Sequence, residues 1–189
     1  PVHVDVRALT AAIAAGDLQG ATRVFTRAVP FPEIIARTCD QPCQAECYRN
    51  TKGGAIQVAA LELTCLQGIS LPKPTLLPQK EARVAVIGSG LASLTAALEL
   101  RKKGCQVSLF TKDNCLGGEI FAYDEVQLPR EVILRETGLL HDLGVELHLA
   151  ESYDPTPLMT EFDALFIGED PQDQALFSVD VASASVKPL

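Results

Sequence analysis

The segment VAVIGSGLAS (residues 84–93) joins an apolar run to an amphipathic stretch through a Gly-x-Gly turn. The run 83–87 predicts a short buried strand, and residues 91–103 predict a helix that ends at Gly104. Between them, Gly88 permits a tight turn and Gly90 lets a backbone N–H approach a phosphate group. Strand, glycine turn and helix in this order make a dinucleotide-binding fingerprint credible.

The same motif departs from the full fingerprint in two places. Ser93 replaces the third glycine, although a small residue there can still allow the helix to pack closely on the strand. An acid that binds ribose hydroxyls is expected at the end of the second strand, where this chain has Thr111, and Asp113 comes two residues late. A Gly-x-Gly element without that acid leaves the affinity for a nucleotide open.

Strands and helices alternate after this motif. Residues 107–110, 145–149 and 164–167 predict strands, and residues 130–143 predict a helix that ends before Gly144. Alternation of this kind favours a parallel sheet built from βαβ units. We therefore expect an incomplete Rossmann-like domain over residues 81–189.

The first 69 residues follow a helical pattern instead. Asp5 is placed to cap a first helix, a second follows over 18–28, and residues 56–66 have helical spacing. Residues 33–37 are interpreted as a short turn after two prolines. Residues 70–80 contain three prolines and no periodicity, which predicts a linker between the two domains. The predicted fold class is α plus α/β: a small helical domain over residues 1–69, then the Rossmann-like domain.

Three cysteines stand in a C-x3-C-x3-C array over residues 39–47, namely Cys39, Cys43 and Cys47. Thiolates at this density suit an iron–sulfur cluster or zinc. Three cysteines leave a four-ligand cluster one ligand short. Ordinary free thiols, or a disulfide in an oxidising compartment, are the alternatives. Zinc is the weaker metal because the usual paired C-x2–4-C knuckles are missing.

Composition excludes several classes of protein. With 24 acidic and 16 basic residues, the net charge is −8, which gives no electrostatic footprint for nucleic acid. No apolar run approaches the ~20 residues that span a bilayer, and the N-terminus has no signal-peptide layout, so we expect a cytoplasmic protein. The sequence begins at Pro1 without an initiator Met, and we expect it to be a fragment of a longer polypeptide.

Taken together, the motifs resemble the glutamate synthase small-subunit family, which includes the N-terminal part of dihydropyrimidine dehydrogenase. The resemblance rests on the stretches FPEIIARTCDQPCQAEC, GAIQVAALE, RVAVIGSGLASLTAALELRKKGCQVSLF and NCLGGEIFAYDEVQLPREVI, and runs from about Pro1 to Ile167. In this family a helical iron–sulfur domain precedes an FAD-binding Rossmann-like domain. The order of the motifs is specific, although each alone is not.

For the helical domain, the resemblance implies a metal site. Cys39 and Cys43 would serve one 4Fe-4S cluster and Cys47 a second, with the remaining cysteines upstream of Pro1. Glu62 falls where some relatives supply a Gln side chain as a cluster ligand. For Glu62 we prefer the alternative of a solvated helix carboxylate.

For the Rossmann-like domain, the resemblance implies an FAD site. Its pyrophosphate loop would be formed by Gly88, Ser89, Gly90, Leu91 and Ala92. Gly117 and Gly118 match a second Gly-Gly element near the phosphates and ribose of the flavin, the alternative being a plain turn. Thr111 occupies the cofactor-binding position at which family members carry an acid.

Two further departures concern the end of the chain. The family has an Ala-Thr-Gly element where this sequence reads FIGED, and a domain for NAD(P)H that has no second Gly-x-Gly-x-x-Gly counterpart here. The implied function is an electron-transfer module that passes electrons between FAD and 4Fe-4S clusters to a partner catalytic subunit or domain, with NAD(P)H as donor in the parent protein. No side chain is predicted to be catalytic. The alternatives are a non-catalytic assembly domain that has lost its flavin and a zinc-stabilised interaction module.

Overall fold

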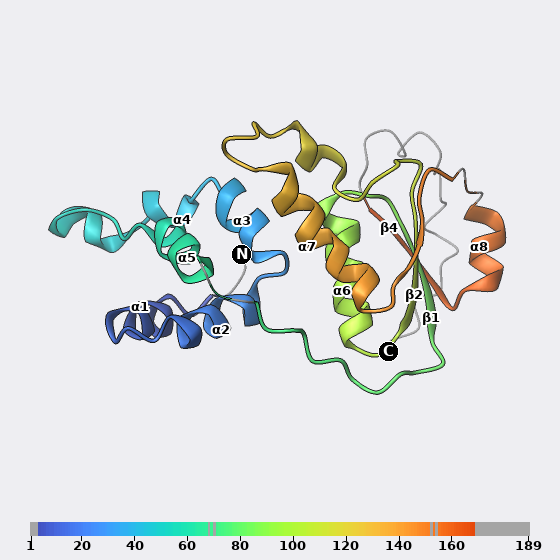
Figure 1. Ribbon diagram of the computed structural model, residues 1–189, viewed down its shortest axis with the longest axis horizontal. Coiled ribbons are helices and arrows are strands. Elements are labelled where there is room, and N and C mark those ends of the chain that lie inside the picture. Colours follow the sequence, from blue (N-terminus) through green and yellow to red (C-terminus); the bar gives the residue numbers. More distant parts are fainter. Residues whose placement is uncertain (1–3, 68, 70, 152, 154, 169–189) are drawn as a thin grey trace.

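The computed structural model describes residues 4–67, 69, 71–151, 153 and 155–168. Figure 1 shows a helical unit beside a unit that contains a sheet, with an extended segment between them. Pro1 and the residues after Gly168, including the end of the FIGED stretch, lie outside the described residues.

The helical unit occupies the N-terminal third of the chain. It contains α1 (Val6–Ala14), α2 (Leu18–Ala28), α3 (Pro32–Thr38), α4 (Pro42–Ala45), the 3-10 turn η1 (Tyr48–Lys52) and α5 (Val58–Leu66). As predicted, Asp5 caps α1, its carboxylate accepting the N–H of Ala8 at 3.0 Å. Leu9, Phe25 and Cys65 are fully buried and form the centre of this unit's core.

Helix α3 replaces the short turn predicted over 33–37. Pro32 stands in the first turn of the helix, where its missing N–H costs nothing and its fixed φ favours the helical conformation. The prediction of a turn was wrong because the prolines end α2 and also begin the next helix.

The second unit is built on parallel strands. Its elements are β1 (Arg83–Ile87), α6 (Leu91–Lys102), β2 (Gln106–Phe110), the 3-10 turn η2 (Gly118–Ala122), α7 (Arg130–Asp142), β3 (Glu146–His148), α8 (Pro155–Glu161) and β4 (Ala164–Ile167). The strand order is β3-β2-β1-β4, and every pair is parallel. The predicted fold class, a helical domain followed by a Rossmann-like parallel sheet, is confirmed, whereas α8 was not predicted.

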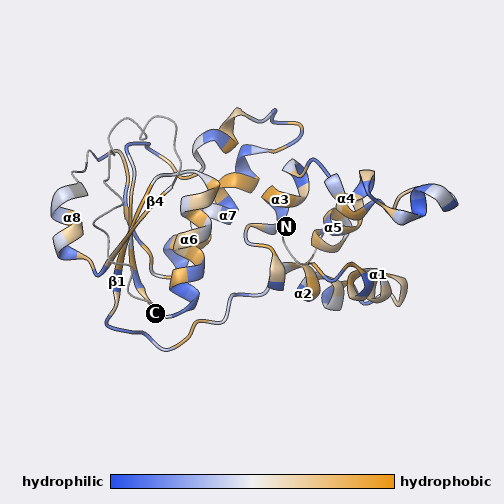
Figure 2. Cartoon of the chain, turned by 180° about the vertical axis from the view of Figure 1, so that it is seen from behind, coloured by the Kyte–Doolittle hydropathy of each residue, from blue (hydrophilic) through white to orange (hydrophobic). Residues whose placement is uncertain are grey.

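The sheet is covered by helices on both faces. Helices α6 and α7 lie between the sheet and the helical unit, and α8 lies on the far side (Figure 1). Val86, Leu94, Leu109 and Ile133 share one buried cluster that joins the strands to α6 and α7. Figure 2 shows the strands as largely hydrophobic and α8 as neutral to hydrophilic, as expected if the α6/α7 side holds most of the core.

The segment 71–80 has no helix or strand and runs past the end of α6. Leu77 donates its N–H to the carbonyl of Lys102 at 2.9 Å, and Lys80 donates to that of Gly104 at 2.8 Å. The connection is therefore held against the sheet-containing unit at its C-terminal end. Across the described part of the chain, no helix is long and apolar enough to cross a membrane.

Candidate functional site

The Gly88–Gly90 loop lies at the carboxyl edge of the sheet, immediately after β1. In the order β3-β2-β1-β4, the strands β2 and β3 lie on one side of β1 and β4 lies on the other. Open α/β sheets bind ligands at the carboxyl ends of the strands where the order reverses in this way, which here is between β1 and β4. Gly88 has a φ of +115° and donates its N–H to the carbonyl of Phe110 at 2.9 Å. The loop is thus fixed to β2, and a side chain at residue 88 would be strained.

Ser93 fits at the position of the missing third glycine. Its hydroxyl is buried and donates to the carbonyl of Ile87 at 2.9 Å. A Cβ on Gly168, just beyond β4, would lie 2.0 Å from Ser93 Oγ. The close packing of helix on strand is therefore kept, because the neighbouring strand supplies the missing space.

The N-terminus of α6 presents its first backbone N–H groups, those of Leu91 and Ala92, without a side-chain cap. Such a terminus favours an anion. A Cβ on Gly90 would lie 2.7 Å from Oε2 of Glu119, so the space beside this glycine holds an exposed carboxylate. The backbone of the loop fits a phosphate group, which would have to displace the flexible Glu119 side chain.

Gly117 and Gly118 lie directly on this loop, although they are almost 30 residues away in sequence. Gly117 donates its N–H to the carbonyl of Ser89 at 2.9 Å. A Cβ on Gly118 would lie 3.2 Å from both the N and the Cα of Gly90. Both glycines have positive φ, at +135° and +47°. The structure therefore brings the two predicted glycine elements together, and the second is more than an isolated turn.

Thr111 stands at the position where an acid is expected, and Asp113 follows two residues later. Thr111 is buried, and its hydroxyl accepts the N–H of Asp113 at 3.1 Å. The Asp113 carboxylate accepts the hydroxyl proton of Ser89 in a short hydrogen bond. Asp113 therefore places a carboxylate at Ser89 of the glycine loop, although it stands two residues beyond the position expected for the acid. Its signal was the polar loop KDN after β2, which is long enough to turn back toward β1.

The three cysteines of the predicted cluster motif lie in an irregular segment. Cys39 is the C-cap of α3, Cys43 lies in the four-residue α4, and Cys47 precedes η1. Cys39 and Cys43 are exposed, and all three are free thiols. Gln41, between the first two, has a φ of +55°. The N–H groups of Ile56 and Arg49, aided by the charge of Arg49, lower the pKa of the Cys47 thiol.

Among the described residues, no group of three or more His, Cys, Asp or Glu side chains is arranged to hold a metal ion. The segment therefore supplies three thiols that are not gathered around a common centre. By themselves, these residues do not fit a 4Fe-4S cluster, which needs about four thiolates around it.

Glu62 is buried on α5, with 8% of its surface exposed. Burial raises its pKa to about 7. The preferred prediction of a solvated helix carboxylate was wrong, because α5 packs this face against α2 and α3. One turn further along, burial and the charge of Glu62 raise the pKa of Cys65.

Comparisons with known proteins agree with this arrangement. Residues 1–69 match the family described as dihydropyrimidine dehydrogenase domain II, 4Fe-4S cluster. Residues 86–162 match the NAD(P)-binding Rossmann-like domain. The resemblance predicted from the motifs is confirmed. Over most of its length the chain resembles the small chain of glutamate synthase and related oxidoreductases.

Individual relatives are longer than this chain. The NADPH-Fe(3+) oxidoreductase subunit beta of Geobacter sulfurreducens is 24% identical over 88% of this chain and 26% of its own length. The glutamate synthase [NADPH] small chain of Azospirillum brasilense is 31% identical over 70% of this chain and 29% of its own length. The chain thus spans little more than a quarter of each.

Among solved structures, the 6-hydroxypseudooxynicotine amine oxidase of Pseudomonas geniculata N1 aligns at 21% identity with a TM-score of 0.41. The alignment covers 85% of this chain and 23% of the oxidase.

Proposed function

We propose that this chain is the electron-transfer module of an NAD(P)H-dependent oxidoreductase. Residues 81–189 would bind FAD, and residues 1–69 would contribute ligands to 4Fe-4S clusters, with residues 70–80 as the linker. Electrons would pass to a partner catalytic subunit or domain, in the cytoplasm. When bound, the flavin and the clusters supply the redox chemistry, and the protein supplies their binding and orientation.

One observation carries the flavin half of this proposal: the two glycine elements meet at the carboxyl edge of the sheet. Gly117 is bonded to Ser89, and Gly118 lies against Gly90. The two glycine turns thus meet beside the uncapped N-terminus of α6, which favours an anion once the Glu119 side chain moves aside. Leu91 and Ala92 would donate to the pyrophosphate, and Thr111 would line the ribose side beside Asp113.

The cluster half rests on Cys39, Cys43 and Cys47 and on the match of residues 1–69 to a 4Fe-4S domain. Because these thiols do not converge, we expect ligands from elsewhere in the parent protein to complete the site. Glu62 is retained as a candidate ligand. Glu62 is buried on α5, which packs against α3, the helix that leads into Cys39, and a buried carboxyl group is an unusual feature.

A first experiment tests the flavin half. The chain is purified anaerobically, its FAD, iron and sulfide are quantified, and FAD binding to the apoprotein is titrated. Gly90→Glu would place a second carboxylate against Glu119 and should abolish FAD binding. Gly138→Glu is the matched control, since it adds the same charge in α7 at a site where nothing lies within 4 Å. Unchanged flavin affinity in Gly90→Glu would remove the assignment of the pyrophosphate loop.

A second candidate function is a non-catalytic assembly domain. It is favoured by the Glu119 carboxylate beside Gly90, which adds negative charge where a pyrophosphate would bind. If the wild-type chain shows no FAD affinity at millimolar concentration while remaining folded, this candidate replaces the first.

A further inference from the structure

Helix α3 belongs to the helical unit by sequence but packs into the core of the other unit. Phe31 and Ile34, which are 2% and 1% exposed, share the buried cluster of the sheet, α6 and α7. Phe31 has a φ of +48°, a conformation that costs free energy for a residue with a side chain. This strained turn directs α3 toward α7, and the packing of Phe31 and Ile34 in the buried cluster holds the turn in place.

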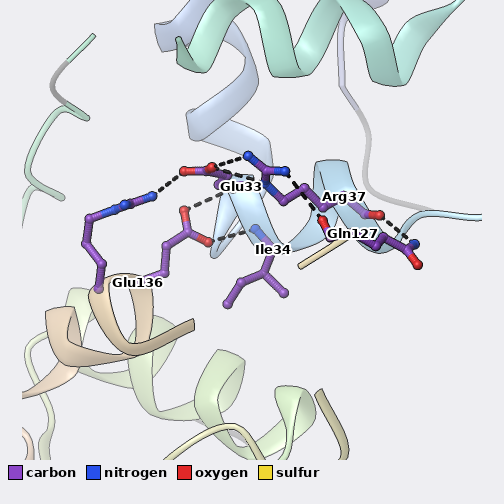
Figure 3. Close-up of polar contacts among 6 residues, drawn as sticks. Glu33, Ile34, Arg37, Gln127 and Glu136 are labelled. Carbon is purple, nitrogen blue, oxygen red and sulfur yellow. Dashed lines mark hydrogen bonds and ion pairs between the residues drawn. The ribbon is translucent and has the colours of Figure 1, made fainter. Parts of the chain in front are cut away.

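The first turn of α3 is capped by a residue of α7. Figure 3 shows the Glu136 carboxylate pointing at the start of α3. Its Oε1 accepts the N–H of Glu33 and its Oε2 accepts the N–H of Ile34, both at 2.9 Å. Glu136 is only 5% exposed. A residue 102 to 103 positions away thus provides the cap that α3 lacks locally.

The last turn of α3 is bonded to the same unit. The side-chain amide of Gln127 donates to the carbonyl of Arg37 at 2.9 Å, and Arg37 Nη1 donates to the carbonyl of Gln127 at 3.4 Å. Between the two ends, Glu33 pairs with Arg37 at 2.8 Å and also with Arg135 of α7 (Figure 3). Both ends of the seven-residue helix α3 are therefore hydrogen-bonded to residues of the sheet-containing unit.

We propose that Glu136 and Gln127 are positioning residues that hold the cysteine segment in place. The residue that follows α3 is Cys39, so the direction in which the segment leaves the helix is set by these two attachments. The clamp consists of Glu136 at the first turn of α3 and Gln127 at its last turn.

The clamp also relates the cysteine segment to the glycine loop. Gln127 lies on the segment that starts at Gly117, and Gly117 is bonded to Ser89. The loop and Cys39 are thus connected through the Gly117–Ser89 backbone bond, the chain from Gly117 to Gln127, and the side-chain amide bond from Gln127 to Arg37. A role for this connection in electron transfer rests on the function proposed above. The clamp itself can be tested without any cofactor.

The test uses the full chain without cofactor and measures amide hydrogen exchange at α3, at Cys39 and at the core of the sheet. Glu136→Ala removes both acceptors, and Glu136→Gln keeps one carbonyl oxygen. Glu131→Gln is the control, since Glu131 is exposed on the same helix. We expect the amides of Glu33 and Ile34 to exchange at least tenfold faster in Glu136→Ala, with a smaller increase in Glu136→Gln and no change in Glu131→Gln.

The same variants separate positioning from general stability. Exchange at the amide of Cys39, which donates to the carbonyl of Ile35 at 2.9 Å, should accelerate severalfold in Glu136→Ala and in Gln127→Ala, while exchange at the core amides of Val86 and Leu109 stays at the wild-type rate. Equal acceleration at these core amides would assign Glu136 a merely structural role. Unchanged exchange at Ile34 would also overturn the proposal. If Glu136→Ala does not fold, Glu136→Gln and Gln127→Ala decide the question.

Discussion

The glycine loop and the cysteine segment carry the two motifs of this chain, and they differ in how far the fold organises them. At the glycine loop, backbone bonds from Gly88 to Phe110, from Gly117 to Ser89 and from Gly168 to Ile87 fix the main chain. In the cysteine segment, short helices follow one another, Cys39 and Cys43 are exposed, Cys47 is half-buried, and the described residues hold no group arranged to bind a metal ion.

The difference follows from what each site is made of. A phosphate site built from backbone N–H groups is complete as soon as the strand, turn and helix have folded. A cluster site built from side chains takes its final geometry only when metal and all its ligands are present. The predictions below test this contrast, beginning with the largest expected effect.

Gly88→Ala should cost about 3 kcal/mol of unfolding free energy, since it combines a positive φ with a Cβ placed 2.6 Å from Ser93 Oγ. Gly54→Ala has nearly the same φ, +108°, with nothing within 4 Å, and should cost about 1 kcal/mol. Urea denaturation of both variants measures the difference. Equal costs would mean that the backbone at Gly88 is no more tightly packed than the backbone at Gly54.

Glu62→Gln should stabilise the metal-free chain by about 1–3 kcal/mol at pH 8. The folded state raises the pKa of Glu62 from 4.5 to about 7, so it binds the proton more tightly than the unfolded state does. Stability from this group is fully present below pH 4.5 and is lost as the pH rises to about 7. The stability difference between variant and wild type should therefore grow over that range and then level off.

The control for this pH series is Glu46→Gln, at an exposed carboxylate in the same unit. It should leave the pH dependence of unfolding unchanged. A parallel shift of both variants would show that Glu62 is not specifically desolvated.

Ser93→Ala should cost about 1 kcal/mol. The variant loses the buried hydroxyl bond to Ile87, but that carbonyl keeps the N–H of Gly168 at 2.9 Å. Thr160→Ala removes a similar hydroxyl bond at an exposed site and should be nearly neutral by thermal unfolding. A cost well above that of a single hydrogen bond would show that Ser93 also supports the loop by packing.

The smallest effect is expected for simultaneous replacement of Cys39, Cys43 and Cys47 by Ser. Unfolding free energy in the metal-free chain should change by about 0.5 kcal/mol or less, because Cys39 and Cys43 are exposed, Cys47 is only half-buried, and serine has nearly the same size as cysteine. Guanidinium denaturation measures this directly. A large loss would show that the cysteine segment is organised before any metal binds.

Much of the fold was predictable because its signals are local. The strand at Arg83–Ile87 follows the apolar run, and Asp5 caps α1 as its position before the first periodic residue predicts. Helix α8 was not predicted, because its seven residues include two prolines in the first turn and are too few to show a helical period. The turn assigned to 33–37 failed for the opposite reason, since Pro32 begins a helix.

The site was predictable only in part. The glycines of both elements were identified by motif and order, and the fold brings them together. Asp113 was discounted because the acid was expected directly at the end of the second strand, and Asp113 comes two residues later. The loop after that strand bends back, so the Asp113 carboxylate still reaches Ser89. The burial of Glu62 depends on which face of α5 meets α2 and α3, which a weakly amphipathic helix does not indicate.

The sequence by itself determined the helical unit followed by alternating strands and helices, the two glycine turns and the presence of three closely spaced thiols. These follow from periodicity and from the conformational freedom of glycine, both of which act over a few residues. Only the tertiary structure decided that Glu136 caps a helix about a hundred residues away, that Gly168 makes room for Ser93, and that Glu62 is buried. Those contacts join segments that meet only after the helices pack on the sheet, so no local pattern could encode them.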